Sequence, residues 1–171
     1  MNLLIWVLTS LGVIGLDQLT KWLTVTYLKP IGDRPLIEGW LHLTYVENTG
    51  AAFGMMKDSR WVFLIVSTVG IAAMLVSLIV KRKTLPLFPG LALSMVIGGG
   101  IGNQIDRLLI GHVTDMIYVK IIDFAVFNVA DSFVCVGAGL LFLYVLFFDP
   151  EVKAEREKKK KRAEAPADGT N

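Results

Sequence analysis

The sequence predicts an all-α integral membrane protein with four transmembrane helices and a small extracytoplasmic loop region that contains β-structure. Hydrophobic residues make up 54% of the 171 residues, and the mean hydropathy is +0.59. A soluble domain of this size rarely reaches that apolar content, because it must cover itself with polar surface. The apolar residues also form long runs, and four of these approach the roughly 20 residues that a helix needs to cross a bilayer.

The four predicted spans cover about residues 3–26, 61–80, 85–105 and 129–148. The first lacks a basic leader and a small-x-small cleavage site, so we expect it to be retained and not removed as a signal peptide. The third is rich in glycine, which permits close approach between helices. In the first outer loop, the run from Trp40 to Val46 is rich in β-formers and predicts a short strand.

Basic residues predict the orientation, because they favour the cytoplasmic side of a membrane. They follow the second and the fourth spans, at Lys81, Arg82 and Lys83 and again from Lys153 onward. Both termini are therefore expected in the cytoplasm, and loops 27–60 and 106–128 outside. We expect residues 1–150 to form the transmembrane domain, and residues 151–171 to be a basic, disordered tail that touches anionic lipid.

Unusual polar residues gather in one layer, near the predicted outer boundary of the membrane. Three of the predicted spans and both outer loops contribute to it, with Asp17, Lys21, Asn48, Gly50, Asn103, Asp106, Arg107, Asp115, Asn128 and Asp131. Some have plain structural explanations. Asp17 and Lys21 are four positions apart and can neutralise each other on one helix face. Asn128 and Asp131 have the spacing of a helix capping box.

Two carboxylates at a membrane boundary also suggest chemistry. If Asp115 and Asp131 meet, they cannot easily both ionise, so one keeps a proton while the other acts as a base. Aspartic peptidases use this arrangement to activate water. Their separation in the sequence does not prove that they meet. A small transporter with a carboxylate relay and a non-catalytic assembly subunit therefore stay open as alternatives.

Other chemistries find little support in the sequence. Cys135 is expected to be a small buried hydrophobe, and neither it nor Ser132 has a base nearby in the sequence. No Cys/His/carboxylate spacing suggests a metal site, and we do not expect His42 or His112 to be ligands. No phosphate-binding loop or nucleic-acid motif is evident, so no cofactor and no nucleic-acid partner are expected.

Five stretches together resemble the bacterial lipoprotein signal peptidases, also called signal peptidase II. They are DQLTK at 17–21, ENTGAAFG at 47–54, GGGIGNQIDR at 98–107, GHVTDM at 111–116 and FNVADS at 127–132. Their order and their positions relative to the spans fit the family over nearly the whole chain up to the tail. Met116 and Gly54 depart from residues common in the family, at positions expected to affect packing only.

The resemblance implies a four-helix aspartic endopeptidase of the bacterial inner membrane. Such enzymes act on diacylglyceryl-modified prolipoproteins and cut just before the lipidated cysteine. It implies Asp115 and Asp131 as the catalytic pair, and a monomer that meets its substrate within lipid. It further implies substrate or globomycin contacts, or shaping of the site, by Asn48, Gly50, Asn103, Arg107 and Asn128. Support of the site would come from Asp17, Lys21 and Asp106.

Overall fold

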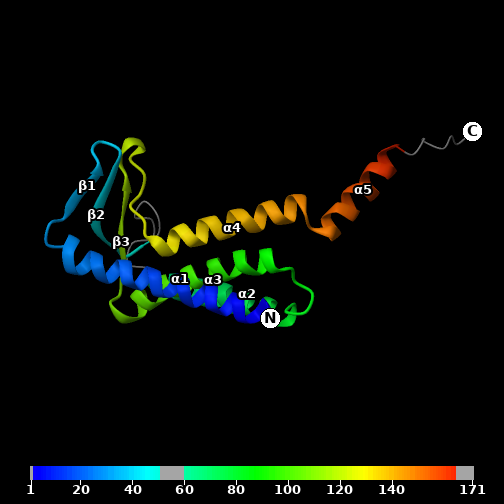
Figure 1. Ribbon diagram of the computed structural model, residues 1–171, viewed down its shortest axis with the longest axis horizontal. Helices are drawn as coiled ribbons and strands as arrows, with labels where there is room; N and C mark the ends of the chain where they lie inside the picture. The colour runs from blue at the N-terminus through cyan, green and yellow to red at the C-terminus, as the bar shows by residue number, and fades with distance from the viewer. Residues whose placement is uncertain (1, 51–59, 165–171) are drawn as a thin grey trace, which may run out of the picture.

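Long helices lie side by side and carry a small sheet at one end (Figure 1). The computed structural model describes residues 2–50 and 60–164, so the 51–54 half of the ENTGAAFG motif, with Gly54, lies outside the described residues. The elements are α1 (Asn2–Leu23), the π-helical η1 (Thr24–Leu28), β1 (Asp33–Ile37), β2 (Leu41–Asn48), α2 (Arg60–Val80), α3 (Leu87–Leu109), β3 (Val113–Val119), the 3₁₀ turn η3 (Lys120–Ile122), α4 (Val129–Phe147) and α5 (Pro150–Glu164).

Three of these helices are long and apolar enough to cross a membrane. They are α1 with its continuation η1 (Asn2–Leu28), α2 and α4. Their outward side chains are largely apolar, and several of them, such as Val66, Val76 and Phe142, are well exposed. A water-soluble protein does not leave such a surface uncovered, so the chain is a membrane protein. A fourth long helix, α3, lies where the third span was predicted.

Helix α3 packs against its three neighbours through glycines, as the glycine-rich run predicted. A methyl group on Gly98 would come within 2.8 Å of the Ser10 carbonyl oxygen of α1. One on Gly99 would collide with the Ala130 carbonyl of α4, and one on Gly100 would press on the Ile71 side chain of α2 at 3.0 Å. At Gly98 and Gly99 only glycine allows the backbones of α1 and α4 to approach α3 so closely.

The sheet is antiparallel, with strand order β1-β2-β3. Strand β2 confirms the strand predicted in the first outer loop. It pairs with β3 across a long stretch of sequence, and this pairing sets Val46 opposite Asp115 and Asn48 opposite Val113. The chain then turns back along β3, because the Phe127 carbonyl accepts the Met116 and Ile117 N–H groups at 3.0 and 2.8 Å. This return places the start of α4 beside the middle of β3.

The expectation of a disordered tail is wrong for Pro150–Glu164, which form α5. The segment is rich in Ala, Glu, Lys and Arg, which are good helix formers. An ion pair of 2.9 Å also joins Glu155 to Lys159 one turn later. Local propensity thus forms a helix here although the segment has no apolar face.

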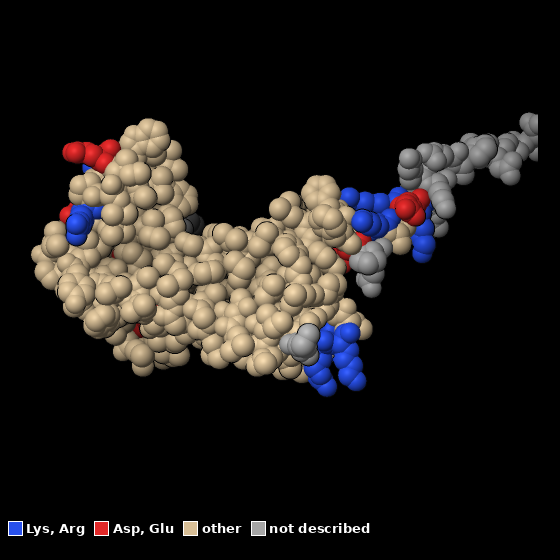
Figure 2. Space-filling model, viewed as in Figure 1, with Lys and Arg blue, Asp and Glu red and all other residues tan. Residues whose placement is uncertain are grey.

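Charges avoid the middle of the helices (Figure 2). On the visible face, Lys and Arg gather at the end that holds α5 and the α2–α3 turn, while both signs of charge lie on the sheet at the other end. On this face, the surface between the two ends shows no charge. An uncharged surface is what a helix bundle needs where it meets hydrocarbon.

Candidate active site

Strand β3 presents Asp115 at the junction of the sheet with the helices. Its side chain is buried, with 1% of the residue exposed. Asn48 lies on the neighbouring strand, in the diagonal position that long side chains reach across a ladder. Its amide Nδ2 donates to Asp115 Oδ2 at 2.9 Å. The β2–β3 pairing therefore brings together two residues that are 67 positions apart.

Asp131 lies in the first turn of α4 and takes part in a capping box. Asn128 is the N-cap, its Oδ1 accepts the Asp131 backbone N–H at 2.8 Å, and its own N–H donates to Asp131 Oδ2 at 3.2 Å. The other carboxylate oxygen, Oδ1, accepts Asn103 Nδ2 at 2.7 Å. The predicted cap is confirmed, and it leaves the carboxylate facing the same junction as Asp115.

The Asn128 side chain joins Asp115 to the first turn of α4, which carries Asp131. Asn128 uses its Oδ1 to cap α4 beside Asp131, and its Nδ2 donates to Asp115 Oδ1 at 2.7 Å. The same Nδ2 donates to Asn103 Oδ1 at 3.0 Å. Asn128 is fully buried, so an unpaired amide here would be costly. The amide therefore holds Asp115 and the start of α4 in one hydrogen-bond network.

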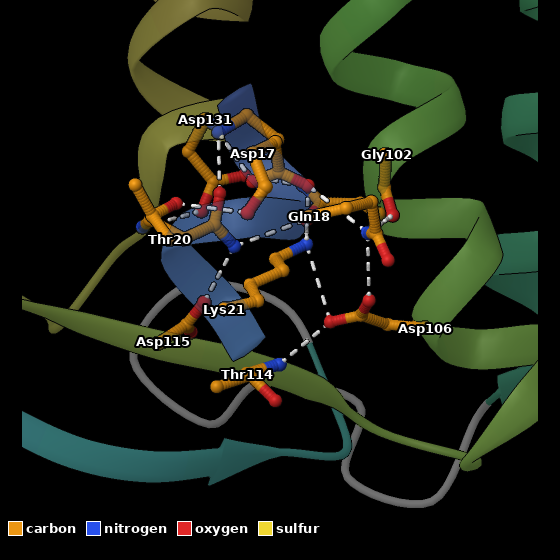
Figure 3. A network of polar contacts seen from close by, with 12 residues as sticks. Asp17, Gln18, Thr20, Lys21, Gly102, Asp106, Thr114, Asp115 and Asp131 are labelled. Carbon is orange, nitrogen blue, oxygen red and sulfur yellow. Dashed lines mark hydrogen bonds and ion pairs between the residues drawn. The ribbon is translucent and has the colours of Figure 1, made fainter. Parts of the chain in front are cut away.

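A second cluster lies next to this network, around a buried lysine (Figure 3). Lys21 Nζ is 2.9 Å from Asp17 Oδ2, 3.2 Å from Asp106 Oδ2 and 2.9 Å from Asn103 Oδ1. The predicted Asp17–Lys21 pair is thus confirmed, and Asp106 joins it from α3. A buried charge needs such partners, because its desolvation is expensive. The cluster fastens α1 to α3 directly behind the two carboxylates.

Gln18 also belongs to this cluster, although it was not among the residues that the sequence predicted for the site. Its Nε2 lies 3.0 Å from Asp106 Oδ1, 3.1 Å from the Gly102 carbonyl and 3.3 Å from Asp17 Oδ2. The only signal in the sequence was its place in the DQLTK motif, directly after Asp17. Amide side chains in apolar helices usually form hydrogen bonds to a neighbouring helix, and this rule would have justified adding Gln18 to the predicted site residues.

A cavity of about 480 Å³ opens beside the carboxylates, and both Asp115 and Asp131 line it. Arg107 also lines it, stacks over the Phe63 ring at 5.1 Å and donates from Nη2 to the Gly50 carbonyl at 3.4 Å. Gly50 in turn donates its N–H to Asn48 Oδ1 at 3.0 Å. Apolar groups form most of the remaining wall, including Phe124, Val126, Phe127 and Cys135.

Burial raises the pKa of Asp115 from 3.8 to about 6. The amide of Asn48 opposes this rise in pKa, the neighbouring Asp131 adds to it, and the amide of Asn128 opposes it again. A carboxyl group with such a pKa exchanges its proton close to neutral pH, as acid–base chemistry requires.

All the predicted site residues come together, but the expectation that Cys135 is buried is wrong. Cys135 is exposed rather than buried, because it lies on the side of α4 that faces the cavity. His42 lies on β2, buried away from the site, with Nδ1 at 2.9 Å from Asp33 Oδ2. Among residues 2–50 and 60–164 there is no group of three or more His, Cys, Asp or Glu that could hold a metal ion.

Comparison with known proteins gives consistent matches. The family model described as "Signal peptidase (SPase) II" matches residues 9–147. A lipoprotein signal peptidase of Caldanaerobacter subterraneus subsp. tengcongensis is 47% identical over 135 residues, which cover 79% of this chain and 91% of that protein. A lipoprotein signal peptidase of Clostridioides difficile (strain 630) is 40% identical over 146 residues, which cover 85% and 97%.

Two solved structures, each described as a bacterial membrane enzyme, share the fold. Their TM-scores are 0.76 and 0.74, at 34% and 33% sequence identity. The matches cover 83% and 85% of this chain, and 87% and 94% of the two structures.

The fold, the matches and the paired carboxylates define a class, which is a membrane protease of the aspartic type. Within that class the chain belongs to the signal peptidase II family. The family predicted from the five motifs is confirmed.

Proposed function

We propose that the chain is an intramembrane endopeptidase that removes signal peptides from diacylglyceryl-modified prolipoproteins and cuts just before the lipidated cysteine. Asp115 and Asp131 are its catalytic pair. The observation that carries the proposal is their shared cavity, together with the Asn128 amide that joins Asp115 to the start of α4 beside Asp131. The family membership supports the choice of substrate.

The reaction needs one ionised and one protonated carboxyl group. The ionised group removes a proton from water, whose oxygen forms a bond to the carbonyl carbon before the cysteine. The protonated group gives its proton to the carbonyl oxygen, and a tetrahedral gem-diol forms. The first carboxyl then donates its newly acquired proton to the leaving nitrogen while the C–N bond breaks. The second carboxyl takes back a proton from the gem-diol, which restores the starting state.

The cavity fits an amphiphilic substrate. Its wall combines the two acids and Arg107 with apolar groups such as Phe63 and Phe124. A signal helix and acyl chains can pack on the apolar part, while the polar part receives the scissile peptide. The proposed contacts are made by Asn48, Gly50, Asn103, Arg107 and Asn128, and Asp17, Lys21 and Asp106 support the site from behind. The reaction needs no metal ion or organic cofactor.

The proposed setting is the bacterial cytoplasmic membrane, which α3 crosses together with α1, α2 and α4, so that the chain has four spans. The basic residues of the α2–α3 turn and of α5 share one end of the bundle, and this supports cytoplasmic termini (Figure 2). The sheet and the site then lie at the outer face, where the loops 27–60 and 106–128 emerge. A site built within one 1–150 domain supports a monomer, with the basic segment after it on anionic lipid.

The test uses purified protein in detergent and a diacylglyceryl-modified prolipoprotein. Asp115→Asn and Asp131→Asn are each expected to reduce cleavage by at least about 10⁴-fold while the protein stays folded. The matched control is Asp123→Asn. Asp123 has a positive φ of 47°, which Asn also tolerates, and it accepts the Tyr118 hydroxyl outside the cavity. Near wild-type cleavage by either dyad variant would refute the catalytic pair.

A further inference from the structure

The amide of Gln18 lies between α1 and α3, among acceptor groups of both helices. Its Nε2 faces two carboxylates, Asp17 and Asp106, and the Gly102 carbonyl (Figure 3). All three partners are acceptors, so only one orientation of the amide is compatible with them. Gln18 therefore links α1 to α3 through donated hydrogen bonds with a fixed direction.

The two carboxylates that Gln18 links hold the backbone directly before each catalytic aspartate. Asp17 Oδ1 accepts the Ala130 N–H at 2.9 Å, and Ala130 precedes Asp131. Asp106 Oδ2 accepts the Thr114 N–H at 3.0 Å, and Thr114 precedes Asp115. All these groups are buried, so the bonds do not exchange readily with water.

A second chain of hydrogen bonds connects the same cluster to the side chain of Asp131. Lys21 binds both carboxylates and also donates to Asn103 Oδ1 at 2.9 Å. Because an ammonium group only donates, Asn103 must turn its oxygen to Lys21 and its Nδ2 to Asp131. If Lys21 moved away, Asn103 would lose the donor that fixes its amide orientation, and its Nδ2 would no longer be held toward Asp131.

We propose that Gln18 is a positioning residue that sets the separation of Asp115 and Asp131, because it ties together the two carboxylates that hold the backbone before each of them. The proposal rests on the function proposed above. It assigns a role in the reaction to a side chain that does not line the cavity.

The charges of the cluster explain why a neutral amide is suited to this position. Two carboxylates, Asp17 and Asp106, share one ammonium group, Lys21. A Glu at position 18 would add a third negative charge beside them. A Lys would compete with Lys21 for the same oxygens. A glutamine donates to both carboxylates and changes no charge.

The expected effect of Gln18→Met is on the pH profile of cleavage. Two carboxyl groups that share a proton titrate at two pH values, and the gap between these values shrinks as the groups move apart. The bell-shaped dependence of kcat/KM on pH should therefore span a narrower pH range in the variant than in the wild type. Its kcat should fall by about 10- to 100-fold with little change in KM, because the substrate contacts remain. The other charged groups that face the dyad, Lys21, Asp106 and Arg107, are unchanged.

Gln104→Met is the matched control. Gln104 also joins two helices through its Nε2, which donates to Ser67 Oγ at 3.0 Å and to Thr68 Oγ1 at 2.8 Å on α2. The substitution removes a comparable bridge whose partners belong neither to the dyad nor to the cluster around Lys21. It is expected to lower the unfolding temperature about as much as Gln18→Met, and to leave the width of the pH profile unchanged.

A second variant covers the case in which Gln18→Met does not fold. Gln18→Glu can still donate one hydrogen bond at acid pH, and it should lose activity relative to wild type as the pH rises. The positioning role is overturned if folded Gln18 variants keep the wild-type profile, if Gln104→Met narrows it equally, or if neither Gln18 variant folds. Activity of Asp115→Asn or Asp131→Asn would instead overturn the proposed function, whatever Gln18 does.

Discussion

Replacing Asn128 by Ser separates its two tasks. The side chain caps α4 through Oδ1 and bridges to Asp115 through Nδ2. Serine also accepts an N–H as an N-cap, so Asn128→Ser keeps the cap and loses the amide donor. A hydrogen bond to a charged partner contributes about 1.5–3 kcal/mol. If this energy holds Asp115 in its reactive position, kcat/KM falls by about 10- to 150-fold.

The pH profile of Asn128→Ser carries more information than the rate. The Asn128 amide lowers the pKa of Asp115, which burial raises to about 6, so the variant should shift that pKa upward. If Asp115 is the base, the acidic limb of the profile moves to higher pH, because the carboxylate must be ionised. If Asp115 is the acid, the alkaline limb moves instead. The assay is cleavage of a lipid-modified substrate from about pH 4 to pH 9.

Asn128→Ala serves as the comparison, because it removes the cap as well. It should lower the free energy of unfolding by about 1 kcal/mol more than Asn128→Ser does. A role of the Asn128 amide in holding Asp115 is refuted if Asn128→Ser cleaves within about threefold of wild type and both limbs of its pH profile are unmoved. It is also refuted if the serine variant loses activity only because it unfolds.

Two further predictions concern stability. Between about pH 4 and pH 6 the folded protein keeps a proton on Asp115 that the unfolded chain releases, because burial raises the pKa from 3.8 to about 6. The free energy of unfolding therefore falls by about 3 kcal/mol as pH rises through this window, and Asp115→Asn should lack this loss. Thermal unfolding at pH 4 and pH 8 measures it, and an equal drop in both proteins would contradict it. Gly102→Ala should cost about 1–3 kcal/mol, because its Cβ would lie 2.5 Å from Asp17 Oδ2. Gly139→Ala, with no atom within 4 Å of the new Cβ, should unfold at or above the wild-type temperature, and equal losses in the two alanine variants would argue against the packing explanation.

The helices and the residues of the candidate site were largely predictable, because their signals are local. A run of apolar residues identifies a candidate span by length alone, and a capping box is readable at the Asn128–Asp131 spacing. The Asp17–Lys21 pair follows from a separation of four positions in a helix.

The parts that sequence reasoning missed depend on contacts between distant segments or on local propensity. The Asn48–Asp115 contact requires the β2–β3 register, which no local pattern fixes. The contacts of Gln18 appear only once α1 and α3 are packed, because its partners Gly102 and Asp106 are more than 80 positions away. Helix α5 was missed for the opposite reason, since the lack of an apolar face outweighed good intrinsic propensity.

The glycines of α3 have a consequence for the biogenesis of the protein. Helix α3 packs against α1, α2 and α4. By composition it is less apolar than those three helices, because it carries several glycines together with Asn103, Asp106 and Arg107. When such a segment moves by itself from the translocon into the lipid, the free energy of transfer is only weakly favourable. Its polar end becomes satisfied only when Lys21 of α1 and the start of α4 are present. Nascent chains that stop after α3 should therefore be poorly retained in the bilayer and become substrates for membrane quality control.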